Sequence, residues 1–147
     1  MKRTRGLLAV AAAGIVLVGC SSGGHSPPRA APTASGATYS SASAVVDALL
    51  LDGVPTGNLD DIGGGMGAAS EVYATVDGVD GVQVATFADR AAENDWMAAG
   101  AQLAKGTGPL AVAVGDNWVA VVPGAQSRRV AGRITAALGG KVDSFNS

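Results

Sequence analysis

Five of the carboxylates in the middle of the chain are candidates for general acid–base chemistry: Asp60, Asp61, Asp89, Glu93 and Asp95. Such chemistry needs two carboxyl groups aimed at one point from different elements. Asp60 and Asp61 are neighbours in one Gly-rich segment, and the other three have a sufficient explanation as anions near a helix start. We therefore predict no catalytic residues and expect a protein that is not an enzyme. The alternative is an enzyme, or an enzyme subunit, that uses carboxylates near the Gly-rich loop 56–69.

Histidine and cysteine are too scarce for other catalytic chemistry. The one His is His25 and the one Cys is Cys20, so the chain after them holds neither a Ser–His nor a Cys–His nucleophile, nor a zinc site. The Asp-rich loops lack EF-hand spacing. The run 63–68 fits the G-x-G-x-x-A pattern, but dinucleotide binding needs a strand before it and a helix after it, whereas an Asp-rich loop and a strand-like segment flank this run. We expect no metal and no cofactor.

Trp96 and Trp118 stand out in a chain that is only 4% aromatic. As a stacking platform they would bind a sugar or a peptide, and they are the candidate ligand-binding residues. The competing interpretation is that both anchor the core, Trp96 from a helix stripe and Trp118 from a strand.

The first 19 residues have the order of an export signal. Lys2, Arg3 and Arg5 form a positive start, and residues 7–18 form an apolar stretch. That stretch would span about 18 Å as a helix, too short for a hydrocarbon core of about 30 Å. A cleaved signal is therefore favoured over a permanent transmembrane helix.

Leu17-Val18-Gly19-Cys20 at the end of this stretch resembles the lipobox of bacterial lipoproteins. The resemblance implies that the Cys20 thiol receives a diacylglycerol and that a dedicated signal peptidase, recognising Leu17, Val18 and Gly19, cuts before Cys20. An ordinary signal peptide whose tail contains a Cys is the alternative. Two acyl chains suffice for stable membrane anchoring, so we expect the protein on the extracytoplasmic face of the cell membrane, bound through lipidated Cys20.

Residues 20–40 after the lipobox are Ser, Gly, Ala, Pro and Thr with almost no large apolar side chain, which predicts a disordered tether. Cleavage would remove three of the ten basic residues and leave seven against twelve acidic ones. An acidic chain has few cations with which to displace counterions, so we expect no nucleic-acid partner. With its only thiol acylated, the mature chain would form no disulfide.

Residues 41–147 are predicted to form a single α+β domain. Apolar spacing and caps predict helices near 41–51, 89–103 and 127–138, and alternating residues predict hairpins near 71–87 and 110–122. The order α-ββα-ββα favours a small two-layer sandwich, a mainly antiparallel four-stranded sheet with helices on one face. The other face would carry small or polar residues such as Gln83, Ala85, Ala111 and Ala113, open to solvent or to a ligand.

The segment 82–90 leading to Trp96, and Gly115-Asp116-Asn117-Trp118 with the strand after it, resemble small lipoproteins of high-GC actinobacteria. The resemblance covers roughly residues 70–140 and implies no activity and no site residues. We therefore predict a lipid-anchored binding or interaction module of the cell envelope, with an envelope protein as a partner. A structural accessory subunit of a membrane complex, docked through the open sheet face, is a further alternative.

Overall fold

The computed structural model describes residues 36–145, which form three helices and one antiparallel sheet. The sheet has six strands in the order β1-β2-β3-β5-β4-β6, where the four-stranded prediction lacked both edges. The inner strands are β2 (Ser70–Val76), β3 (Val79–Thr86), β4 (Leu110–Val114) and β5 (Trp118–Pro123). The edges are β1 (Thr56–Gly63) and β6 (Lys141–Asp143). The α+β class is confirmed, and both predicted hairpins form.

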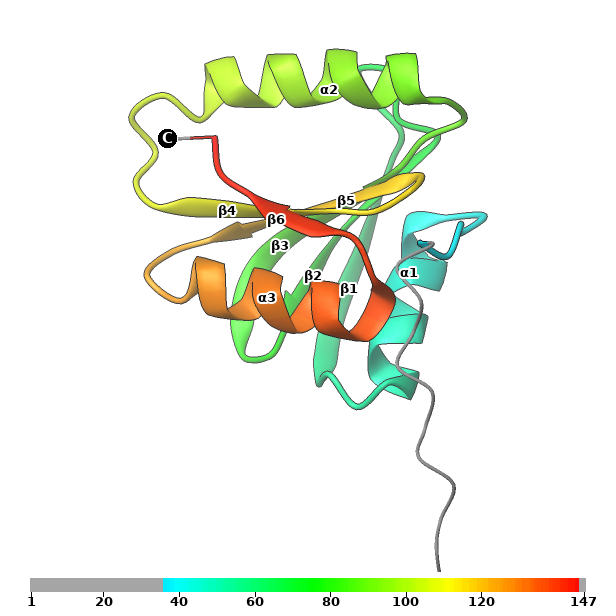
Figure 1. Cartoon of the computed structure of the whole chain (residues 1–147), viewed down its shortest axis with the longest axis vertical. Helices are drawn as coiled ribbons and strands as arrows, with labels where there is room; N and C mark the ends of the chain where they lie inside the picture. Colours follow the sequence, from blue (N-terminus) through cyan, green and yellow to red (C-terminus); the bar gives the residue numbers. More distant parts are fainter. Residues whose placement is uncertain (1–35, 146–147) are drawn as a thin grey trace, which may run out of the picture.

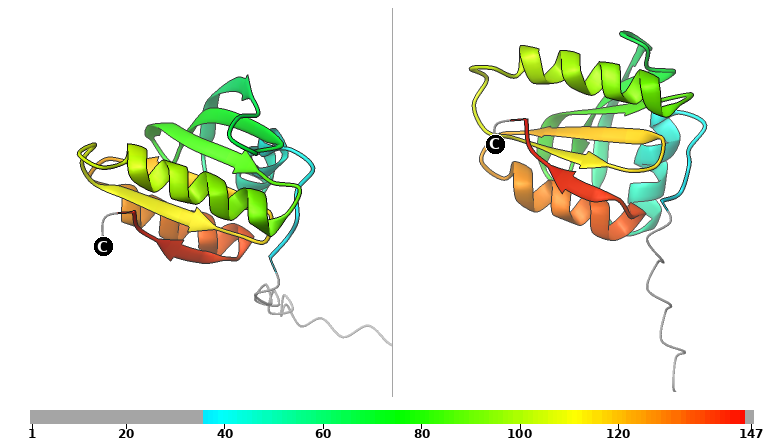
Figure 2. Two further views of the ribbon diagram at one scale, coloured as in Figure 1. Left: turned by 90° about the horizontal axis from the view of Figure 1, so that it is seen from above. Right: turned by 45° about the horizontal axis from the view of Figure 1, so that its top comes forward.

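Helices cover both faces of the sheet, so the prediction of helices on one face is wrong. The helices α1 (Ala42–Leu51) and α3 (Ser127–Leu138) lie on one face, and α2 (Arg90–Leu103) lies alone on the other (Figures 1 and 2). The physical reason is that the inner strands are apolar on both sides. Val84 and Val122 face α1 and α3, whereas Ala85 and Val119 face α2.

The α1/α3 face carries the larger core. It joins the buried sides of α1 and α3 to every second residue of the inner strands, and its members include Val45, Leu49, Val72, Val82, Ala111, Ala113, Trp118, Val130 and Ile134. Ala111 and Ala113 therefore belong to this core and do not lie on the face that carries Gln83 and Ala85. The predicted open face combined residues from two different sides of the sheet.

The helix starts follow from local sequence. The Ser41 side chain accepts a hydrogen bond from the Ala44 amide at 3.2 Å, and Asp89 accepts one from the Ala92 amide at 2.9 Å. Side-chain oxygens at these positions satisfy amides that have no partner within the helix. The helix α2 therefore begins directly after Asp89.

The segment 56–63, predicted as part of the Gly-rich loop 56–69, is the edge strand β1. Its sequence does not predict a strand, because it contains Gly57, Asn58 and two Asp residues, which are rare in strands. Pairing with β2 forms it nevertheless, with irregularities in the register between Gly57 and Asp60 and between Asp61 and Gly63. Charged, bulged edges of this kind discourage further strand addition. Asp60 and Asp61 are exposed on this edge.

A two-residue turn at Asp77-Gly78 joins β2 to β3 and ties the sheet to α3. Both residues have positive φ, 50° and 79°, as a type I′ turn requires. The Asp77 carboxylate accepts hydrogen bonds from Arg129 Nη1 at 2.6 Å and from Arg133 Nη1. Two arginines of α3 therefore pair with one carboxylate of this turn within the molecule.

The described chain joins the domain ahead of α1. The Tyr39 amide donates to Asn117 Oδ1 at 2.9 Å, and Asn117 Nδ2 donates back to the Tyr39 carbonyl at 2.8 Å. Residues 1–35, which include the lipobox, Cys20, His25 and most of the predicted tether, lie outside the described residues. Within residues 36–145, no helix is long and apolar enough to cross a membrane.

Candidate functional site

A pocket of about 400 Å³ lies between α2 and the sheet. Its floor comes from Tyr73 of β2, Gln83 of β3, Leu110 of β4 and Val121 of β5, so all four inner strands contribute. Its roof is the sheet-facing side of α2, and its lining there is Trp96, Gly100, Leu103 and Ala104. Its volume falls within the range of about 300–1,000 Å³ typical of small-molecule sites.

The pocket is surrounded by large apolar side chains that remain in contact with water. Met66 is 54% exposed, Tyr73 40% and Leu103 69%, and all three line the pocket. They come from three separate segments, the loop after β1, β2 and the end of α2, so they meet only in the folded protein. Clusters of exposed apolar side chains commonly mark sites where something binds.

A buried carboxylate supports the polar part of the pocket from behind. Glu71 of β2 is only 5% exposed, and its Oε1 accepts a hydrogen bond from Trp96 Nε1 at 2.7 Å. The same oxygen accepts from Gln83 Nε2 at 3.2 Å. Trp96 and Gln83 both line the pocket, so Glu71 fixes the orientation of two pocket side chains that come from different layers. A hydrogen bond to a charged acceptor is stronger than one between neutral groups.

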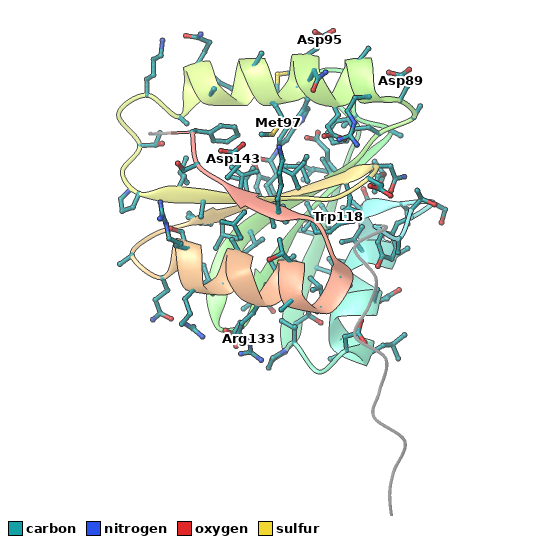
Figure 3. All side chains as sticks on the ribbon, in the orientation of Figure 1. Asp89, Asp95, Met97, Trp118, Arg133 and Asp143 are labelled. Carbon is teal, nitrogen blue, oxygen red and sulfur yellow. The ribbon has the colours of Figure 1, made fainter. Side chains whose placement is uncertain are left out.

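A second carboxylate, Glu93, is buried beneath the start of α2. It is 3% exposed, and its Oε1 accepts a hydrogen bond from Arg90 Nη1 at 2.6 Å. Its Oε2 is buried without a hydrogen-bond partner. The sequence explained Glu93 only as an anion near the helix start, but the buried positions of α2 are Glu93 and Trp96, whereas Leu103 is largely exposed. Figure 3 shows the two sides of α2, with Asp95 directed away from the sheet and Met97 directed towards it.

The C-terminal segment closes one side of the pocket. Phe145 follows β6, lines the pocket and packs with the cluster on the α2 face. Its ring fits against Gly100, because a Cβ on Gly100 would lie 3.3 Å from Phe145 Cζ. Phe87 supports the other end of the cluster, with its ring centroid 5.7 Å from that of Trp96 in an edge-on arrangement.

The two tryptophans predicted as ligand-binding residues have different surroundings. Trp96 is 2% exposed and lines the pocket between α2 and the sheet. Trp118 is fully buried in the core on the α1/α3 face, against Gly115, where no added Cβ would fit. The structure therefore brings only Trp96 to the pocket, and Trp118 has no exposed surface on which a ligand could stack.

The candidate carboxylates do not assemble at the Gly-rich segment. Asp60 and Asp61 are exposed on β1, Asp89 caps α2, and Asp95 is exposed on the outer side of that helix. Among residues 36–145, no group of three or more His, Cys, Asp or Glu side chains could hold a metal ion.

Sequence reasoning missed Glu71, which supports the pocket from behind, and Phe145, which lines it, whereas Gln83 was expected on a face open to solvent or to a ligand. The sequence does contain a hint for Glu71, because the alternation of its strand places this acidic residue on the opposite face from the apolar residues Val72 and Ala74. Such a position faces either solvent or a second layer, and only the presence of α2 decides between them. Phe145 had no signal, because its role depends on β6 folding back onto the sheet.

The comparisons with known proteins identify no relative. No protein-family model, no curated protein and no solved structure matches this chain.

Proposed function

We propose that this protein is a lipid-anchored extracytoplasmic binding module of the cell envelope, and that it binds its ligand in the pocket between α2 and the sheet. The anchor rests on the sequence Leu17-Val18-Gly19-Cys20. The binding role rests on one observation, the apolar pocket whose Trp96 and Gln83 are held by buried Glu71.

The surroundings of the carboxylates favour binding over catalysis. Glu71 accepts two hydrogen bonds through Oε1, and Glu93 accepts one from Arg90. Neither residue lines the pocket. A general acid or base must reach within about 3 Å of the proton that it transfers. We therefore propose that the carboxylates position other side chains and that the protein is not an enzyme.

The alternative of an accessory subunit docked through an open sheet face loses its support, because helices cover both faces of the sheet within residues 36–145. An envelope protein remains a partner that the exposed apolar residues around the pocket could contact. We propose a small-molecule ligand ahead of a protein partner, because a pocket encloses a ligand on several sides.

The anchor is tested by expressing the full chain in a bacterium with lipoprotein processing. We expect the protein in the membrane fraction, with the mass of a chain that begins at Cys20 and carries a diacylglyceryl group. The Cys20→Ser variant should lack this mass and the firm membrane association, whereas the neighbouring Ser21→Ala variant should retain both. An unmodified, freely secreted wild-type chain would contradict the anchor.

The binding role is tested on the same purified protein. Solvent extraction followed by mass spectrometry should release a small molecule from the wild-type chain. Val121→Phe, which fills the pocket floor, should lose that molecule. Leu51→Phe, which adds the same ring at an 87% exposed position on α1, should retain it.

A further inference from the structure

The geometry points to the chemical class of the ligand: an uncharged, largely apolar molecule that carries a hydrogen-bond donor. This inference rests on the proposed function, in that it takes the pocket between α2 and the sheet as the binding site. It adds which ligands that pocket accepts and which it rejects.

Charge excludes anions from the pocket. The lining residues include no Asp, Glu, Lys or Arg. An anion would lose its hydration without gaining a cation, and it would lie near the Glu71 carboxylate behind Trp96 and Gln83. The guanidinium of Arg90 is already paired with Glu93 at 2.6 Å. A carboxylate, sulfonate or phosphate group therefore has no counter-charge among the lining residues.

Charge also disfavours cations. Glu71 is 5% exposed and does not line the pocket, so its carboxylate is not offered to a ligand. The oxygen nearest to the lining residues, Oε1, already accepts two hydrogen bonds. A cation would therefore leave water for a site that gives it no direct anionic contact.

The polar groups of the lining favour a ligand that donates. Gln83 Nε2 donates one of its two hydrogens to Glu71, which fixes the amide and leaves its carbonyl Oε1 as an acceptor. Thr107 uses its hydroxyl hydrogen for the Ala104 carbonyl at 2.8 Å, which leaves its Oγ1 lone pairs as acceptors. Two polar side chains of the pocket thus have acceptor oxygens available, and the single donor of Thr107 is already used. A ligand hydroxyl or N–H group would complement them.

The remaining walls specify an apolar body. Leu103, Leu110, Val121 and Phe145 supply aliphatic and aromatic surface around the polar groups. The exposed side chains Met66 and Leu103 extend that surface to the solvent side of the pocket. Burial of apolar ligand surface would supply most of the affinity, and the acceptors would set the orientation.

Three matched probes test this class on the mature chain from residue 20, carrying Cys20→Ser so that no lipid competes. N-phenyl-1-naphthylamine is uncharged and has one N–H donor. 1-Anilinonaphthalene-8-sulfonate adds a negative charge, and 1-phenylnaphthalene lacks the N–H group. We expect the sulfonate to bind at least ten-fold more weakly than the amine. The hydrocarbon should bind roughly two- to ten-fold more weakly, the loss of one hydrogen bond.

The two tryptophan indole N–H signals report where each probe binds, because the chain has only two Trp. In ¹H–¹⁵N spectra, the amine should shift the Trp96 signal, which belongs to the pocket, and leave that of Trp118, buried on the other face. Val121→Phe should weaken binding and Leu51→Phe should not. If Val121→Phe does not fold, the comparison of the three probes on the protein without this substitution still tests the proposal.

Each contrary outcome identifies what is wrong. If the sulfonate binds as tightly as the amine and shifts the Trp96 signal, the ligand class is overturned and the pocket remains a binding site. If the hydrocarbon matches the amine, the donor requirement is overturned. If no probe moves the Trp96 signal, the pocket is not a ligand site, and the binding part of the proposed function fails with it.

Discussion

The two faces of the sheet are built differently. On the α1/α3 face, two helices bury a continuous aliphatic core in which Leu49, Val84 and Ile134 are fully inaccessible to water. On the α2 face, a single helix covers a smaller cluster that contains Phe87, Trp96 and Phe145, two buried carboxylates nearby, and the pocket. Figure 1 shows this asymmetry, with α1 and α3 below the sheet and α2 above it.

The difference agrees with our proposal that one side of the sheet stabilises the fold and the opposite side binds a ligand. A close-packed aliphatic interior stabilises the fold but leaves no room for a ligand. The α2 face keeps space and buried polar groups, features that reduce packing and suit recognition. Four predictions test this division, from the largest expected effect to the smallest.

Leu49→Ala should destabilise the protein far more than Leu103→Ala. Both remove the same atoms from a helix, but Leu49 is fully buried on the α1/α3 face whereas Leu103 is 69% exposed beside the pocket. We expect a loss of about 2–5 kcal/mol in the free energy of unfolding for Leu49→Ala and under about 0.5 kcal/mol for Leu103→Ala. Urea denaturation measures both. Similar losses would show that the two faces contribute equally to stability.

Glu71→Ala should reduce the free energy of unfolding by about 1–3 kcal/mol, because it leaves buried donors of Trp96 and Gln83 without their acceptor. Glu71→Gln is the matched control, since its amide oxygen can still accept from both. The Trp96 indole N–H signal should move strongly in the Ala variant and less in the Gln variant. An unchanged signal in Glu71→Ala would contradict the role of Glu71 in holding the pocket.

Asp77→Asn should remove a pH-dependent contribution that belongs to the α1/α3 face alone. Burial by itself would raise the pKa of the Asp77 carboxyl, but hydrogen bonds and charge from Arg133 and Arg129 outweigh burial and lower it below 3.8. Because the folded-state pKa is the lower one, the stabilisation is complete above the unfolded pKa, about 3.9, and is lost as the pH falls through the folded value.

The expected loss for Asp77→Asn at neutral pH is at most about 1 kcal/mol, since both arginines are about half exposed. Asn before Gly78 preserves the type I′ turn, so the variant isolates the ion pairs. The difference from the wild-type protein in urea unfolding should shrink at about pH 2. Asp47→Asn, an exposed carboxylate on α1, is the control. A difference that persists at low pH would mean that the turn is responsible.

Gly100→Ala and Gly132→Ala compare one added methyl group beside Phe145 on the α2 face with one that meets no neighbour on α3. Both glycines lie inside helices, where Ala is favoured by up to about 1 kcal/mol. A Cβ at Gly132 of α3 meets nothing within 4 Å, whereas one at Gly100 of α2 lies 3.3 Å from Phe145 Cζ. We expect Gly132→Ala to raise the free energy of unfolding by the whole helix preference of Ala over Gly. Gly100→Ala should raise it by a few tenths of a kcal/mol less. Thermal unfolding measures both changes. Equal gains would show that Phe145 yields freely.

Much of the fold could be predicted from local patterns. The helices near 41–51 and 127–138 and the two inner hairpins follow from apolar spacing, caps and the Asp-Gly turn signals, which act within a few residues. The edge strands β1 and β6 were not predicted. In β1, the residues Gly57, Asn58 and Asp60 have little intrinsic strand preference. Pairing with β2, a tertiary contact, forms β1.

Trp96 and Gln83 of the candidate site could be predicted from the sequence. The helix of Trp96 and its burial on the sheet side were expected, but its partner Glu71 comes from a strand 25 positions earlier in the chain. The burial of Glu93 could not be predicted, because a carboxylate near a helix start is already explained by the helix dipole and normally faces solvent. The structure instead buries Glu93 beside Trp96 and exposes Leu103.

The sequence by itself determined the features that depend on neighbouring residues: the export-signal pattern with its Cys20, the absence of His and Cys after residue 25, the helix caps, and the alternation of the inner strands. Only the tertiary structure decided that α2 crosses to the opposite face from α1 and α3. Inner strands that are apolar on both sides accept a helix on either side, so the alternation does not settle which. That one choice creates the pocket, because it brings Trp96 over Gln83 and Glu71, and no shorter-range signal encodes it.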